Sequence, residues 1–194
     1  MKTSDLRLGI DFDEPIYPWH SRAHDVATQA GITGDCTRSF TWFPWEEYGC
    51  TKGEWVAALT EATLDGYLYS AAPNEGAVEA LQQLADVGAQ IFLITARGNG
   101  RLPNADVIRQ HTHDYIDRWN IPHHGVYFTR DKGTVARQLK VTHAIDDNLE
   151  NYLAFVGAGA ITYLLDTPWN MVPGFPVRRV NSLSEFAEQI LVKV

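Results

Sequence analysis

Short apolar runs alternate along the chain with segments in which apolar residues recur at helical spacing. A short apolar run that ends at polar residues is typical of a buried strand, whereas the longer spacing is typical of a helix with one buried face. The pattern predicts strands over residues 6–11, 90–95, 126–129, 143–145 and 160–165.

Helices are predicted in the gaps between these strands, and start and stop signals mark several of them. The expected helices are one that Asn74 caps and that ends before Gly88, one that opens at Asn104, two over residues 134–139 and 149–156, and one that follows a Ser182-x-x-Glu185 capping box. Strands that alternate with helices in this way predict the α/β class, here a Rossmann-like three-layer fold with a parallel sheet covered on both faces.

The segment over residues 20–72 breaks this alternation. It is rich in aromatic residues and lies between the first predicted strand and the first predicted helix of the alternating part. We therefore expect a small, mostly helical cap over residues 20–72, inserted into a core formed by residues 1–19 and 73–194.

Composition and charge narrow the classes of function. The 194 residues are 45% hydrophobic, which is enough for one core plus an inserted subdomain, and no apolar run approaches the ~18 residues of a membrane span. The net charge of −8 argues against a nucleic-acid polymer as partner. Two cysteines, Cys36 and Cys50, and a polar start without an export signal indicate a cytoplasmic location.

Chemically active residue types follow the predicted strands. Asp11 and Asp13 come after the first strand, and Thr95 ends the second. Lys132 follows the third strand, and Asp146 and Asp147 stand at the end of the fourth. In open α/β sheets, ligands bind outside the carboxyl ends of the strands. We therefore expect these side chains to converge on one crevice.

The residue types suit phosphoryl transfer. Carboxylates can hold Mg²⁺ through oxygen ligands, and one of them can attack phosphorus to form an aspartyl-phosphate. A threonine hydroxyl and a lysine ammonium can stabilise the charge on the phosphoryl oxygens. A second aspartate can protonate the leaving oxygen and then activate water. The sequence therefore predicts a site for a small phosphorylated substrate.

The order of these residues resembles the haloacid dehalogenase superfamily. Four segments carry the resemblance: IDFDEP (residues 10–15), IFLITAR (residues 91–97), TRDKG (residues 129–133) and AIDDN (residues 144–148). The resemblance implies that Asp11 is the nucleophile and a metal ligand, and that Asp13 is the general acid/base and a ligand through its carbonyl. It assigns phosphate binding to Thr95, Ala96 and Lys132, and Mg²⁺ binding to Asp146 and Asp147.

Within the superfamily, the chain is similar to the 5′(3′)-deoxyribonucleotidases and their bacteriophage-encoded relatives. The similarity lies in the helical cap, IYPWH (residues 16–20), ITAR (residues 94–97) and TPWN (residues 167–170). It implies a nucleoside monophosphate as substrate, in the cytoplasm of the cell or of a virus's host, and leaves a homodimer open.

The expected substrate pocket contains residues whose roles stay open at this point. Trp42, Phe43 and Trp45 either stack on a nucleobase or form a small core of the cap itself. Arg97 either reaches the phosphate or orders the loop after the second strand.

One position departs from the family pattern. A glycine usually follows the second aspartate of the first motif, whereas Glu14 and Pro15 follow it here. A proline biases the residue before it toward an extended conformation, so we expect Glu14 to be extended. A further carboxylate at this place is expected to repel a phosphate and to lower activity.

Three other functions compete with this one. The departure at Glu14 suggests a catalytically weak or inactive nucleotide- or protein-binding module on the same fold, and a different phosphorylated metabolite would fit the same chemistry. A response-regulator receiver is disfavoured because its acidic pair follows the first strand. A zinc site at His111 and His113 is disfavoured because residues two apart on a helix do not face each other.

Overall fold

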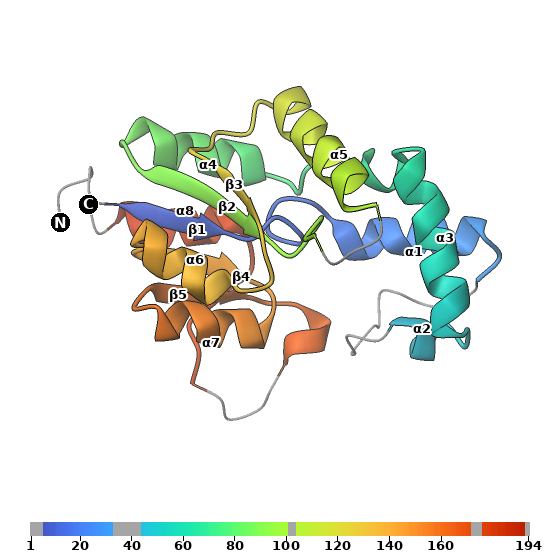
Figure 1. Cartoon of the computed structure of the whole chain (residues 1–194). Coiled ribbons are helices and arrows are strands. Elements are labelled where there is room, and N and C mark those ends of the chain that lie inside the picture. Colours follow the sequence, from blue (N-terminus) through green and yellow to red (C-terminus); the bar gives the residue numbers. More distant parts are fainter. Residues whose placement is uncertain (1–5, 33–43, 101–103, 172–175, 193–194) are drawn as a thin grey trace.

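The computed structural model describes residues 6–32, 44–100, 104–171 and 176–192 (Figure 1). Within these ranges the strands form one sheet in the order β3-β2-β1-β4-β5-β6, and every pairing is parallel. The strands are β1 (Arg7–Ile10), β2 (Gln90–Thr95), β3 (Val126–Phe128), β4 (His143–Asp146), β5 (Ile161–Leu165) and β6 (Arg179–Val180). This confirms the predicted parallel α/β sheet.

Helices cover both faces of the sheet, so the core has three layers. One face carries α4 (Ala77–Asp86), α5 (Ala105–Arg118) and α8 (Leu183–Leu191), whose buried side chains belong to the larger apolar cluster. The opposite face carries α6 (Lys132–Leu139) and α7 (Leu149–Gly157), which contribute Ala136 and Phe155 to a second cluster. The alternating pattern of the sequence therefore encodes two apolar cores separated by one sheet.

The central strand β1 is covered on both faces. Leu8 and Ile10 are fully buried, as expected for a strand between two parallel neighbours. Gly9 lies where a Cβ atom would come within 3.2 Å of the side chains of Phe155 and Val141. A glycine at this position lets helix α7 approach the sheet directly beside the first motif.

Two predicted helix starts differ in detail from the structure. The residue that precedes α4 is Gly76 with φ 71°, and the amide of Asn74 instead donates to the carbonyl of Glu14, so Asn74 is not the cap. Ser182 does cap α8 by accepting from the Glu185 backbone. A capping box also requires the Glu185 carboxylate to accept from the backbone of Ser182. It accepts instead from the backbone of Asn181, so only the Ser182 half of the box forms.

The segment between β1 and α4 is helical in its described part. It contains α1 (Trp19–Gln29), α2 (Pro44–Glu47), α3 (Lys52–Leu64) and the 3₁₀ helix η3 (Tyr67–Tyr69), and Figure 1 shows α1, α2 and α3 on one side of the sheet. Tyr48 and Trp55 are buried with residues of α1 in a core of its own. We refer to this insertion as the cap.

The described helices include none that combines the length and the apolar character required to cross a membrane.

Candidate active site

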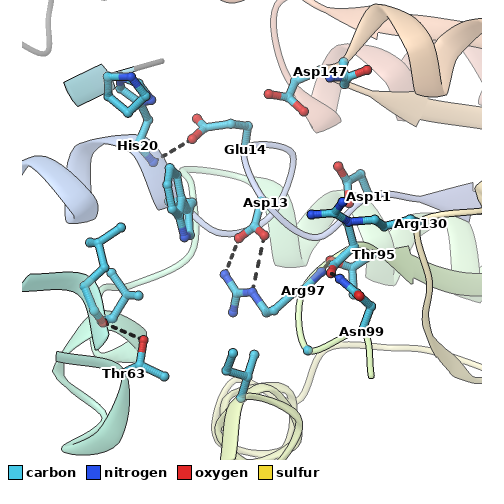
Figure 2. A pocket seen from close by; sticks show the side chains of 18 of the residues that line it. Asp11, Asp13, Glu14, His20, Thr63, Thr95, Arg97, Asn99, Arg130 and Asp147 are labelled. Carbon is cyan, nitrogen blue, oxygen red and sulfur yellow. Dashed lines mark hydrogen bonds and ion pairs between the residues drawn. The ribbon is translucent and has the colours of Figure 1, made fainter. Parts of the chain in front are cut away.

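The three central strands bring the predicted motif residues together. Strand β1 pairs with β2 on one side and with β4 on the other, so the residues at their carboxyl ends are neighbours. Asp11 follows β1, Thr95 ends β2 and Asp146 ends β4, while Lys132 opens α6. Figure 2 shows Asp11, Thr95 and Asp147 around the inner end of one cavity.

Lys132 joins two of the strand ends. Its ammonium lies 2.7 Å from Oδ1 of Asp11 and 2.7 Å from Oδ2 of Asp146, and all three side chains are buried. Burial by itself lowers the pKa of Lys132, but the two carboxylates raise it above its ordinary value. The lysine is therefore charged and fixes the orientation of the Asp11 carboxylate.

Asp11, Asp146 and Asp147 form an acidic cluster in which one carboxylate oxygen of each lies within 4.8 Å of the others. Burial and the neighbouring carboxylate of Asp146 raise the pKa of Asp11 to about 8, although Lys132 opposes the shift. Burial and the charges of Asp146, Asp11 and Glu14 raise the pKa of Asp147 well above its ordinary value. Three buried carboxyl groups thus face one ammonium, and both burial and mutual repulsion oppose the ionisation of all three.

The acidic cluster fits a divalent cation. All of its donors are carboxyl oxygens, the ligand type that Mg²⁺ and Ca²⁺ prefer, and the charge of a cation would favour the ionised form of all three groups. The carboxylate of Asp13 is not part of the cluster. Its predicted contribution was through the backbone carbonyl, and this stays a prediction.

Hydrogen bonds hold the two acidic residues after β4 in place. Oδ1 of Asp146 accepts from the backbone of Asn148 at 2.9 Å and from the side chain of Asn151 at 3.1 Å. Oδ2 of Asp147 accepts from the indole of Trp169 at 3.0 Å. Asn151 carried no sequence signal, because an asparagine on a helix is ordinarily exposed.

Thr95 and Ala96 line the same cavity as Asp11 and Lys132. The hydroxyl of Thr95 is fully buried and accepts from the backbone N–H of Arg97 at 3.1 Å. These two residues therefore lie where the sequence placed a phosphate site, and their phosphate-binding role is a prediction.

Arg97 contacts Asp13 and not the acidic cluster. Its guanidinium donates to both carboxylate oxygens of Asp13, which Figure 2 shows as two dashed lines. The group lies 4.6–4.8 Å from the ring centres of Phe12, Tyr17 and Tyr69. This buried aromatic box restricts the motion of Arg97, and Arg97 in turn fixes the carboxylate expected to act as general acid/base.

Glu14 differs from the expectation. Its φ is 69°, so it adopts the left-handed conformation that glycine favours and is not extended. The backbone N–H of Glu14 donates to the carbonyl of Tyr17 at 2.8 Å, and Asn74 donates to the Glu14 carbonyl. These contacts from both sides offset the cost of the left-handed conformation, which is about 1–2 kcal/mol.

The carboxylate of Glu14 is engaged by the cap. It accepts from the backbone N–H of His20 at 2.7 Å, in the first turn of α1, where no residue of the helix provides a side-chain cap. Burial raises the pKa of Glu14 to about 7, although this hydrogen bond opposes the shift. The side chain therefore serves as the missing helix cap, an arrangement that a sequence pattern of neighbouring residues does not reveal.

The cavity has a volume of about 580 Å³ and extends from the acidic cluster into the cap. Its cap side is mostly apolar and includes Trp19, Trp45, Trp55, Val56, Leu59, Leu68 and Tyr69. Trp45 lines the cavity and also packs against the core of the cap, so it takes part in that core, while stacking on a nucleobase stays a prediction. Trp42 and Phe43 lie outside the described residues. Except for Trp45, the apolar lining residues were not identified from sequence.

Arg130 was also missed. It follows β3, is exposed and lines the cavity near Asp11, as Figure 2 shows. The only sequence signal was its place two residues before Lys132.

Similar folds are found among solved structures, while no protein-family model and no curated protein matches the sequence. A haloacid dehalogenase-like hydrolase from Streptococcus pneumoniae aligns with a TM-score of 0.63 at 13% identity, over 97% of this chain and 99% of the other. The chain has the haloacid dehalogenase-like fold. A predicted phosphoglycolate phosphatase from Haemophilus somnus aligns with a TM-score of 0.64 at 10% identity, over 98% and 99%.

A defluorinating L-2-haloacid dehalogenase also aligns, with a TM-score of 0.58 at 11% identity, over 96% of this chain and 95% of the other. The haloacid dehalogenase-like fold is thus shared with hydrolases of two chemistries. The similarity to deoxyribonucleotidases and bacteriophage proteins stays a prediction.

A divalent cation should stabilise the protein more as the pH rises from 5 to 8. Burial and neighbouring carboxylates raise the pKa of Asp11 to about 8 and that of Asp147 well above its ordinary value, so the folded protein keeps protons that the unfolded chain releases near pH 4, and stability from these groups falls as the pH rises. A cation must displace those protons, which costs less at higher pH. The melting temperature with and without Mg²⁺, measured across this range, should diverge; a constant difference would contradict the acidic cluster as the binding site.

A series of variants at Glu14 should separate backbone strain from helix capping. Glu14→Gln keeps an oxygen for the His20 N–H and should lose little stability, whereas Glu14→Ala removes the cap and should lose about 1–2 kcal/mol. Glu14→Gly should recover about 1 kcal/mol of that loss, because glycine is not strained at φ 69°. Urea unfolding measures the free energy of unfolding of each variant. Equal stability of the glycine and alanine variants would exclude backbone strain at Glu14.

Proposed function

We propose that the chain is a magnesium-dependent phosphomonoester hydrolase that acts through an aspartyl-phosphate on nucleoside monophosphates. One observation carries the proposal: the buried Lys132 ammonium contacts both Asp11 and Asp146, beside Asp147 and at the inner end of a large cavity. This combination provides a fixed nucleophile, a cation site and room for a leaving group.

The chain's own residues support two successive displacements. The Asp11 carboxylate attacks phosphorus while the bond to the leaving oxygen breaks, and Asp13 donates a proton to that oxygen. Asp13 then accepts a proton from the water that attacks the phosphorus of the aspartyl-phosphate, which releases phosphate and restores Asp11. Lys132 holds Asp11 in position throughout. Mg²⁺, bound by the acidic cluster, would neutralise charge on the phosphoryl oxygens.

The cavity's lining supports an uncharged leaving group with an aromatic part. Among the lining residues that the structure describes from α1 to η3, there is no aspartate, glutamate, lysine or arginine. The hydroxyls of Thr60 and Thr63 donate to the carbonyls of Val56 and Leu59 in their own helix, so they have no hydrogen left for a ligand. A nucleoside has this character, and tryptophan rings can stack on its base.

The hydrogen bond that Glu14 makes with helix α1 counts against an inactive binding module. Such a module was suggested by a repelling carboxylate at Glu14, but this carboxylate is bound at the start of α1. A phosphatase for another small metabolite remains a competing hypothesis. A phosphate-release screen over nucleoside monophosphates, sugar phosphates, phosphoglycolate and an aryl phosphate, with and without Mg²⁺, distinguishes them.

Asp11→Asn should lower phosphate release by at least about a thousandfold, because it removes the nucleophile. The fold should persist, since an asparagine oxygen can still accept from Lys132. Asp25→Asn, at an exposed carboxylate of α1, is the matched control and should retain full activity. Phosphate release by the folded Asp11→Asn protein at the wild-type rate would refute the proposed mechanism.

Trp45→Ala should slow hydrolysis of a nucleoside monophosphate about ten- to hundredfold. This ratio corresponds to the loss of one base stacked on an aromatic ring, which contributes about 1–3 kcal/mol. Hydrolysis of acetyl phosphate should change little, because its leaving group does not extend into the cap. Trp119→Ala, at a partly exposed tryptophan after α5, is the control. An equal loss with both substrates would show that Trp45 serves only the cap's core.

A further inference from the structure

The indole of Trp169 contacts both parts of the molecule at once. Trp169 belongs to the 3₁₀ helix η4 (Pro168–Asn170), which follows β5 in the core. Its Nε1–H donates to Oδ2 of Asp147 at 3.0 Å. Its ring stacks on the imidazole of His20 in α1, with centroids 4.4 Å apart and an interplanar angle of 26°. One side chain thus connects a carboxylate of the acidic cluster with the cap.

The core holds Trp169 in place through its neighbour Asn170. The side-chain amide of this buried residue donates to the carbonyl of Asp147 at 2.7 Å and to the carbonyl of Leu165 at 2.6 Å. Arg179 in β6 donates to the side-chain oxygen of Asn170 at 3.0 Å. The backbone of η4, which carries the indole, is therefore anchored to the core strands, while the ring itself also contacts His20 of the cap.

The cap holds His20 in place independently. The backbone N–H of His20 is bound by the Glu14 carboxylate, while its imidazole faces the indole. Figure 2 shows Glu14 between His20 and Asp147, with its carboxylate directed toward His20. Any displacement of α1 relative to the core must change the stacking on Trp169 or move the indole.

We propose that Trp169 is a positioning residue that ties the Asp147 carboxylate to helix α1, so that cation affinity and the seating of the cap depend on each other. The inference rests on the proposed cation site. By binding one oxygen of Asp147, the indole N–H orients the other, and such outer hydrogen bonds commonly change metal affinity 10–100-fold. Linkage is reciprocal. If the seated cap raises the affinity of the acidic cluster for a cation, a bound cation stabilises the seated cap by the same free energy.

Two variants separate the two contacts of the indole. Trp169→Phe keeps an aromatic face for His20 but has no N–H for Asp147. His20→Ala removes the stacking partner but keeps the backbone N–H that Glu14 binds. Trp119→Phe is the control, because Trp119 is partly exposed after α5 and is not among the residues that line the cavity.

The first experiment measures Mn²⁺ affinity by titration calorimetry. We expect Trp169→Phe to bind about tenfold more weakly and the Trp119→Phe control to bind as wild type. His20→Ala should also weaken binding, but it should have no further effect in the Trp169→Phe background, since its influence passes through the indole. Wild-type affinity in Trp169→Phe, or an equal effect of His20→Ala in both backgrounds, overturns the proposal.

A second experiment needs no metal. The melting temperatures of His20→Ala, Asp147→Ala and the double variant are compared in a chelator, with and without Trp169→Phe. The two losses should be non-additive with the indole present and additive without it, because residues with no shared partner act independently. Additivity in both backgrounds overturns the link.

This comparison remains valid if the wild type binds no divalent cation. That result would refute the proposed metal-dependent function, while the melting temperatures in the chelator would still decide whether Trp169 couples Asp147 to His20. Asp147→Ser replaces Asp147→Ala if the alanine variant does not unfold cooperatively.

Discussion

A buried ammonium between two carboxylates is the constraint on which the site depends. The Lys132 side chain is buried, and a buried charge without partners costs several kcal/mol. Its partners come from the ends of β1 and β4, while the lysine begins α6, so the three elements must meet at this point for the charge to be satisfied. The cap and Arg97 line the same cavity as Lys132 and lie next to this ion cluster.

Much of the core could be predicted because its signals are local. Strand β2 coincides with the predicted run over residues 90–95, since a buried parallel strand is a continuous apolar segment. The motif residues could be placed at one edge because the carboxyl ends of parallel strands share an edge of the sheet. The two-residue strand β6 was missed, because two residues are too few to establish any period.

The features that sequence reasoning missed arise from contacts between distant segments. Pro15 favours an extended Glu14, but hydrogen bonds with Tyr17 and Asn74 override that local preference. Likewise, nothing in the spacing of apolar residues along α3 distinguishes the side chains that face the cavity from those that fill the cap's core. The haloacid dehalogenase-like fold does not settle the chemistry either, because it supports both phosphatases and dehalogenases among the similar structures.

The two hydrogen bonds that Asn74 makes with the loop after β1, here called the clasp, have a consequence for the architecture as a whole. Asn74 binds the carbonyl of Glu14 through its side chain and that of Ile16 through its backbone, so the chain leaves the core and returns to it at one place. The cap is therefore a module with adjacent ends, and a chimaera joined at this clasp would keep the catalytic loop closed. A foreign cap grafted there would have to reproduce the contacts with the core, among them one ring against Arg97 in place of Tyr69 and one against Trp169 in place of His20. The lining of the cavity would then change by exchange of the module while the residues at the carboxyl ends of the strands stay unchanged.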